Sequence, residues 1–177
     1  MSDDLTAAYA NIGRFFCAFA ELEKAVDATF IKIFKLDGHP NAAVITRAVR
    51  FNTRLDFIRH FIAAPRASND VAFSAQWKND ANAMWDAAND LRCKRNAFAH
   101  GILKPMECGK VGVEDRSTNK APSFDQSGFD DLLEKIKTTA VEFQTFQARL
   151  DAKLAHQRSI GVFAGHSFLG DAFFSKE

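Results

Sequence analysis

Apolar side chains recur at steps of three and four residues along the first part of the chain, and this spacing most narrows what the chain can fold into. The positions are Leu5, Ala8, Ile12, Phe15, Phe16, Phe19, Leu22, Val26, Phe30 and Ile33. Such steps match one face of an α-helix, whose period is about 3.6 residues. The spacing therefore predicts a long helix from about Asp4 to Leu36 with one side buried.

Two further helices are predicted after this one. Pro40 suits the first turn of the second helix and Pro65 ends it, with a break near Asn52 and Thr53. The third helix is predicted after Ser68. Its apolar stripe consists of Val71, Trp77, Ala81, Met84, Ala88, Leu91 and Phe98.

The helical period is lost between Ile102 and Ser127. Glycine and proline accumulate there around a β-prone run from Lys110 to Val113, which predicts a loop or a short hairpin. A fourth long helix follows, with Phe129, Leu132, Leu133, Ile136, Phe143, Phe146, Leu150 and Leu154 on one side. Residues 1–158 are therefore predicted to form an all-α, up-and-down bundle of four to five helices with an insert between the last two long helices.

Residues 159–177, SIGVFAGHSFLGDAFFSKE, form a Phe/Gly-rich C-terminal tail. Its three glycines disfavour a helix, and its four phenylalanines are too many for a comfortably solvated segment. The tail is expected to dock, either on its own domain or against a second protomer or another partner.

Composition limits the classes of function. The chain has 177 residues, of which 47% are hydrophobic, enough for one globular core. Its 23 basic and 22 acidic side chains nearly cancel, so any attraction to nucleic acid must come from a local patch. Cys17, Cys93 and Cys108 form no C-x-x-C pair, which argues against a disulfide framework and a zinc ribbon and favours a reduced cytosol.

Membrane and metal signals are missing from the sequence. The first residues, MSDDLTAAYA, are acidic, and no apolar run approaches the roughly 20 residues that a membrane-spanning helix needs. A soluble, cytoplasmic protein without a membrane partner is predicted. Because no His/Cys ligand spacing or carboxylate cluster occurs, no metal or other cofactor is expected.

The stretch LRCKRNAFAHG concentrates basic and polar groups at the end of the third predicted helix. Arg92, Asn96 and His100 are one turn apart along one stripe, and Arg95 is adjacent. Two guanidinium groups, an amide and an imidazole on one patch suit a phosphate. The guanidinium group offers a rigid fork of donors, and the imidazole titrates near neutral pH.

A helix terminus explains the same residues without any function. Cationic side chains are favoured in the last turn because they offset the negative end of the helix dipole. Gly101 stands where a C-cap glycine in the left-handed conformation belongs. An isolated R-x4-H string is therefore a weak signal.

Arg95, Asn96 and His100, written R-N-A-F-A-H, resemble the R-x(4 to 6)-H motif of HEPN domains, in which a polar residue commonly follows the arginine. The motif of that family also lies late in a long helix of an all-α bundle. The stretch FAELEKAV, Phe19 to Val26, is similar to the opening helix of bacterial HEPN proteins. The Gly- and Pro-containing insert and the Phe-rich tail depart from the family's pattern.

The resemblance implies a metal-independent endoribonuclease that acts as a homodimer, with two motifs facing one another across a shared cleft. Neutral His100 then takes the proton from a ribose 2′-hydroxyl or gives one to the leaving 5′-oxygen, and Arg95 stabilises the charge on the scissile phosphate. Asn96 orients His100 or holds the sugar. The expected products are 2′,3′-cyclic phosphate and 5′-hydroxyl ends, and DNA is inert because it lacks the attacking hydroxyl. Such an enzyme suits a toxin or a phage-defence effector.

Further basic residues and one acid are candidates for supporting roles. The candidate phosphate- or RNA-binding residues are Arg92, Lys94, Arg47, Arg50 and Arg54. The last three are spaced to share a helix face, which either follows an RNA backbone or is an ordinary solvated face. Glu23, amid apolar neighbours in the first helix, either pairs with Arg95 or Arg92 or points to solvent.

Two other classes of function fit the sequence as well. One is a non-catalytic HEPN-like module that binds a nucleotide, an RNA or a protein partner such as a nucleotidyltransferase antitoxin. The other is a plain helical interaction protein whose R-x4-H string is only a helix terminus.

Overall fold

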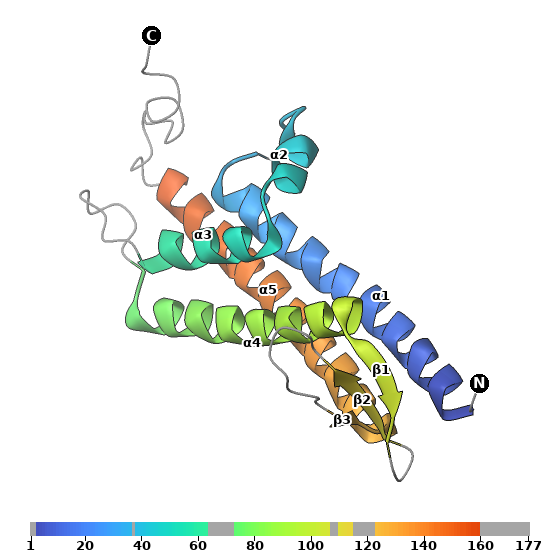
Figure 1. The fold of residues 1–177 in the computed structure, drawn as a ribbon. Helices are drawn as coiled ribbons and strands as arrows, with labels where there is room; N and C mark the ends of the chain where they lie inside the picture. Colours follow the sequence, from blue (N-terminus) through green and yellow to red (C-terminus); the bar gives the residue numbers. More distant parts are fainter. Residues whose placement is uncertain (1–2, 37, 64–72, 107–109, 115–122, 160–177) are drawn as a thin grey trace. The chain divides into compact units, whose positions relative to one another are not determined.

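The chain is all-α, as predicted, with a small strand insert between the last two long helices (Figure 1). The computed structural model describes residues 3–36, 38–63, 73–106, 110–114 and 123–159. Within them the helices are α1 (Asp3–Ile33), α2 (Ala42–Ala48), α3 (Phe51–Ala63), α4 (Ala75–His100) and α5 (Gln126–Ser159). None of these described helices combines the length and the apolar character needed to cross a membrane. The Phe-rich tail from residue 160 onward lies outside the described residues.

The ends of the first two predicted helices are shifted. α1 ends at Ile33, three residues early, because Lys35 turns the chain with a φ of 53° and Gly38 follows with a φ of 73°. Pro40 precedes the N-cap residue of α2 and so is not in the first turn of that helix. The break between α2 and α3 falls before Phe51 rather than near Asn52, because the chain is already extended at the C-cap of α2.

The insert is an antiparallel sheet in the order β1-β2-β3. Its strands are β1 (Ile102–Pro105), β2 (Val111–Glu114) and β3 (Ser123–Phe124). β1 pairs with β2 from Ile102 opposite Glu114 to Pro105 opposite Val111, and β3 adds to the other side of β2. The hairpin suggested by the run from Lys110 to Val113 is thus present, and β1 begins directly after α4 (Figure 1).

Contacts divide the chain into two compact units. Unit 1 comprises Met1–Ala25 and Ala83–Glu142, and unit 2 comprises Val26–Asn82 and Phe143–Glu177. The three long helices α1, α4 and α5 each contribute residues to both units. The candidate site and the sheet belong to unit 1.

Phe98 of α4 lies at the centre of an aromatic cluster in unit 1. Its ring centroid is 4.9 Å from that of Phe15 in α1, 5.2 Å from Phe124 in β3 and 5.7 Å from Phe129 in α5. Fully burying one phenylalanine contributes roughly 1.5–3 kcal/mol, and ring pairs at these separations add to that. This cluster holds the last turns of α4 against three other elements.

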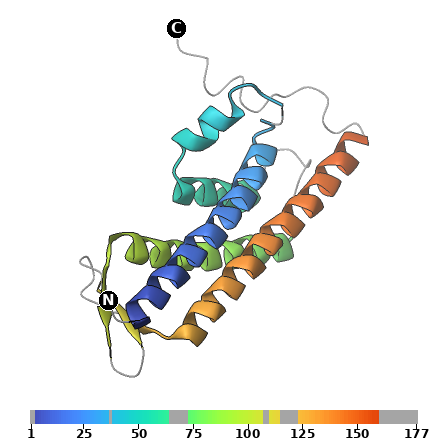
Figure 2. The ribbon, with the colours of Figure 1, turned by 90° about the vertical axis from the view of Figure 1, so that its right-hand side faces the viewer.

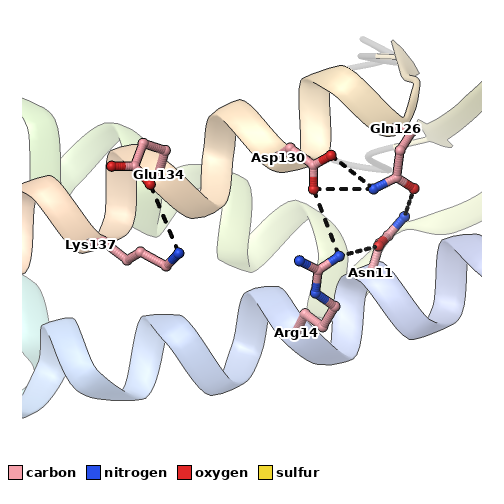
Figure 3. A network of polar contacts seen from close by, with 6 residues as sticks. All are labelled: Asn11, Arg14, Gln126, Asp130, Glu134 and Lys137. Carbon is pink, nitrogen blue, oxygen red and sulfur yellow. Dashed lines mark hydrogen bonds and ion pairs between the residues drawn. The ribbon is translucent and has the colours of Figure 1, made fainter.

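A polar network adds a second link between α1 and α5 in unit 1. Figure 2 shows the N-terminal half of α1 alongside the first turns of α5, and Figure 3 shows the contacts. Asn11 Nδ2 donates to Gln126 Oε1 at 2.8 Å, and Arg14 donates to Asn11 Oδ1 at 3.2 Å. Arg14 also pairs with Asp130 at 3.7 Å. Asn11 is only 7% exposed, so these hydrogen bonds satisfy an amide that would otherwise be costly to bury.

Unit 2 is held by aromatic packing and by ion pairs. Trp77 of α4 packs its ring 5.1 Å from that of Phe146 in α5 and 5.2 Å from Phe73. Ion pairs between its helices include Arg149–Asp80 at 2.8 Å, Lys32–Asp151 at 3.2 Å and Arg54–Asp27 at 2.7 Å.

Candidate functional site

The R-x4-H residues all lie at the end of α4, whose last residue is His100. Asn96 and His100 are one turn apart and therefore share a helix face. Arg95 and His100 are five residues apart, which places them about 140° apart around the helix axis. Phe98 lies between them in the sequence and is buried, so its packing fixes the backbone that carries both groups.

The Arg95 side chain is held from two directions. Its guanidinium carbon lies over the ring of Phe16 in α1, 5.9 Å from the ring centroid. One guanidinium nitrogen donates to Asn96 Oδ1 at 3.3 Å. Cation–π contacts contribute roughly 0.5–2 kcal/mol according to exposure, enough to bias the rotamer. Because Asn96 shares the face of His100, this hydrogen bond draws the guanidinium toward the side of the imidazole.

Phe16 is a site residue that the sequence analysis assigned only to the apolar face of the first helix. A signal for its separate role was present, since Phe15 and Phe16 are adjacent and about 100° apart on a helix. Phe15 is fully buried, while Phe16 is partly exposed. Only one of the two rings therefore faces the core, and the other supports Arg95.

His100 is exposed at the end of α4. Its imidazole makes no hydrogen bond or ion pair with any other residue in the described part of the chain, so it does not cap its own helix there. An imidazole in this position is accessible to a ligand and can accept or donate a proton.

Arg92 and Lys94, both predicted to bind phosphate, have different partners. Arg92 donates through Nε and Nη2 to Asn89 Oδ1, at 3.0 and 2.8 Å. Lys94 instead pairs with Asp90 at 2.6 Å, and Lys135 of α5 pairs with the same carboxylate at 2.8 Å. The charge of Lys94 is therefore compensated within the protein, which makes it a weaker candidate for a phosphate ligand than Arg92 or Arg95.

The Asp90 carboxylate is stabilised in its charged form. Partial burial raises its pKa, but the hydrogen bonds from Lys135 and Lys94 outweigh burial and leave the pKa below the ordinary value of 3.8. Asp90 therefore remains ionised at neutral pH and anchors α4 to α5. It does not act as a proton donor or acceptor near neutrality.

Charge compensation distinguishes Arg92 and Arg95 from most basic residues around them. In unit 1, Arg14, Lys94 and Lys135 each contact a carboxylate. Arg92 and Arg95 hydrogen-bond to the neutral amides of asparagines, and no ion pair joins either of them to a carboxylate among the described residues. The end of α4 thus carries two partly buried guanidinium groups without an acidic partner in that part of the chain.

Gly101 is needed for space rather than for a left-handed conformation. The predicted left-handed C-cap is wrong, because the described glycines include only Gly38 with positive φ. A Cβ at Gly101 would lie 2.5 Å from the carbonyl oxygen of Ala97 and 2.6 Å from Val113 Cγ1. β2 therefore packs directly against the end of α4, beside the motif.

The second basic stretch does not form one exposed face. Arg54 is buried, pairs with Asp27 at 2.7 Å and donates to the carbonyl of Thr46 at 2.9 Å. Arg47 and Arg50 are exposed, but Arg50 lies between α2 and α3. The prediction that Arg54 shares an RNA-facing surface with them is wrong, because helix spacing alone does not identify which side is buried.

Of the two alternatives for Glu23, an ion pair with an arginine of α4 is not formed among the described residues. No ion pair joins it to Arg92 or Arg95 there, since those arginines donate to Asn89 and Asn96. From α1, the Phe16 ring contacts the Arg95 guanidinium.

Among the residues with described positions, no group of three or more His, Cys, Asp or Glu side chains is placed to hold a metal ion. Comparisons with protein-family models, with curated proteins and with solved structures found no match to this chain.

Proposed function

We propose that the protein is a metal-independent endoribonuclease of the HEPN type, with Arg95, Asn96 and His100 as its active site. The observation that supports this most is the uncompensated charge at the end of α4. Among the described residues both arginines hydrogen-bond to neutral asparagine amides and pair with no carboxylate, and the imidazole of His100 is exposed at the end of the same helix. A phosphate supplies the counter-charge, and guanidinium is the side chain best matched to it.

The helix dipole opposes an anion at this position, but its effect is the smaller one. A charge near a helix end gains or loses roughly 0.3–1 kcal/mol at an exposed site. A hydrogen bond to a charged group is worth about 1.5–3 kcal/mol. Two guanidinium groups therefore favour a bound phosphate despite the negative end of α4.

The proposed chemistry is transfer of the phosphate to the neighbouring 2′-oxygen. His100 accepts the 2′-hydroxyl proton, the 2′-oxygen attacks phosphorus, and the bond from phosphorus to the 5′-oxygen breaks. Arg95 donates to the nonbridging oxygens as their charge increases, and Asn96 keeps the guanidinium aligned. The products are a 2′,3′-cyclic phosphate and a 5′-hydroxyl.

The proposed active form is a homodimer. One imidazole accepts only one proton, and the leaving 5′-oxygen needs a proton of its own. A second copy of the motif, facing the first across a cleft, supplies that proton donor. RNA cleavage of this kind suits a toxin or a phage-defence effector that is controlled by a protein antitoxin.

The test is cleavage of labelled RNA by the full chain in EDTA. His100→Ala and Arg95→Ala are each expected to lower the rate by about 10²–10⁴-fold, since they remove the proton acceptor and the phosphate ligand. Lys94→Ala is the matched control on the same helix. Its charge is already paired with Asp90, so a change of no more than about fivefold is expected.

Two outcomes contradict the proposal. Cleavage that survives either alanine substitution places the activity in another site or another protein. If the wild-type protein binds RNA or a nucleotide through Arg95 without cutting, the protein is a non-catalytic binding module instead.

A further inference from the structure

An aromatic patch in unit 2 leaves two phenylalanine rings facing solvent. Phe34, just after α1, and Phe57 of α3 pack edge to face with ring centroids 5.5 Å apart. The buried ring of Phe30 lies 4.7 Å from Phe34 and 6.1 Å from Phe57. The Phe30 ring therefore supports both solvent-facing rings from the buried side. We call this surface the Phe34/Phe57 patch.

The exposure of this patch is unusual for the described part of the chain. Phe57 is 45% exposed, a larger fraction than any other phenylalanine among the described residues. Phe34 is partly exposed beside it. A single exposed apolar side chain is ordinary, but paired aromatic rings held in a fixed arrangement form a surface suited to a ligand with rings of its own.

Segment 160–177 follows Ser159, the last residue of α5. Lys32 of α1 pairs with Asp151 of α5 at 3.2 Å, so the end of α1 lies beside the last turns of α5 within unit 2. α5 ends at Ser159, about 12 Å further along its axis than Asp151. Ten extended residues beyond that point span about 33–36 Å. The segment is therefore long enough to reach the patch of its own chain.

We propose that segment 160–177 docks on the Phe34/Phe57 patch of the same chain. The segment carries four aromatic rings that suit this surface, namely Phe163, Phe168, Phe173 and Phe174. Offset or edge-to-face packing of these rings on Phe34 and Phe57 removes apolar surface of the segment and of the patch from water. The short covalent tether gives the segment a high effective concentration at its own patch, which favours it over a second copy.

Hydrogen exchange of the full chain, followed by mass spectrometry, tests this proposal. Backbone amides of segment 160–177 are expected to exchange at least about tenfold more slowly in the wild-type protein than in Phe57→Ser. Val141→Ser is the matched control, because Val141 is also apolar and is 57% exposed but belongs to unit 1. It is expected to leave the exchange of the segment unchanged.

A second variant covers the case in which Phe57→Ser does not fold. Phe168→Ser combined with Phe173→Ser leaves the patch intact and is expected to speed exchange in α3 around Phe57. The proposal is overturned if segment 160–177 exchanges equally fast in the wild-type protein and in Phe57→Ser. It is also overturned if the double variant leaves the exchange of α3 around Phe57 unchanged. It is also overturned if the protection grows with protein concentration, because the occupant is then a second copy.

Discussion

At the scale of single residues, the contacts of the Arg95 side chain make the end of α4 a candidate anion-binding site. The guanidinium is supported by the Phe16 ring and aligned by Asn96, so it loses little conformational freedom when an anion binds. Lys94, one residue away in sequence, is tied to Asp90. Two neighbouring cations on one helix thus have different roles because their partners differ.

Replacing Phe16 tests the support of Arg95. Phe16→Leu keeps most of the apolar volume but removes the ring face, and it is expected to lower RNA cleavage about 2–30-fold, the range of one cation–π contact. Stability is expected to change by less than about 1.5 kcal/mol. Phe16→Tyr keeps the ring and should retain activity. If Phe16→Leu and Phe16→Tyr lower RNA cleavage equally, the contact between the ring face and the Arg95 guanidinium does not contribute to activity.

The sequence predicted the position of the candidate catalytic residues in the fold better than it predicted the residues that contact them. The apolar period correctly placed Arg95, Asn96 and His100 at the end of a long helix. The period did not distinguish Phe16 from the core phenylalanines. It also did not reveal that Arg54 faces Asp27, because spacing defines a helix face without naming the element that packs on it.

At the scale of elements, the junction between α4 and β1 sets the position of the motif. The Gly101 N–H donates to the carbonyl of Ala97 at 2.7 Å, and Val113 of β2 packs against the same place. The helix therefore ends at His100 and the sheet starts without an intervening loop. Glycine marked this end correctly in the sequence, although the reason is close packing rather than backbone handedness.

Gly101→Ala is expected to destabilise the protein by about 1–3 kcal/mol, because the new methyl group overlaps a backbone oxygen and a buried valine. Gly13→Ala is the matched control on α1, where nothing lies within 4 Å of the added Cβ. It is expected to stabilise the helix by about 0.5–1 kcal/mol. The denaturant concentration at half-unfolding measures both. A neutral Gly101→Ala would contradict the close contact with β2.

The remaining element boundaries depended on details that periodicity does not contain. The end of α1 is set by Lys35 in a left-handed conformation, which few non-glycine residues adopt. The two residues of β3 have too little pattern to be recognised and are defined only by pairing with β2.

At the scale of the whole molecule, each unit contains a carboxylate whose ionised form is stabilised. In unit 1 this carboxylate is Asp90. In unit 2, hydrogen bonds from Arg149 and then Gln76 lower the pKa of Asp80 below its ordinary value of 3.8. A lowered pKa means that the unfolded chain binds more protons in acid. Both groups therefore stabilise the folded state above about pH 4, and this contribution is lost as the pH falls further.

Acid unfolding tests these two carboxylates. The free energy of unfolding, measured in urea, is expected to fall as the pH decreases below about 4, and Asp90→Asn should reduce the steepness of that fall. Asp80→Asn should also reduce the steepness, because the Asp80 carboxylate pairs with Arg149 at 2.8 Å. Asp131→Asn, an exposed carboxylate at the start of α5, is the control and should leave the slope unchanged. An unchanged slope in Asp90→Asn would contradict its role.

The division into two units is a property of the whole molecule that the sequence did not indicate. The apolar faces of α1, α4 and α5 continue through both units, so the pattern along each helix is uninterrupted. A face pattern predicts that a side is buried but does not say which partner covers each part. The single domain expected for residues 1–158 stays a prediction.

The proposed RNA cleavage by Arg95 and His100 is tested most directly through the 2′-hydroxyl that attacks the phosphate. An RNA that the wild-type protein cuts is compared with the same RNA carrying one 2′-deoxynucleotide on the 5′ side of the cut, both in EDTA, and the new ends are identified by mass spectrometry. The predicted result is a 2′,3′-cyclic phosphate end from the first RNA and no cleavage at that position in the second. Cleavage at the 2′-deoxy position, or a 3′-hydroxyl end, contradicts the proposed role of Arg95 and His100.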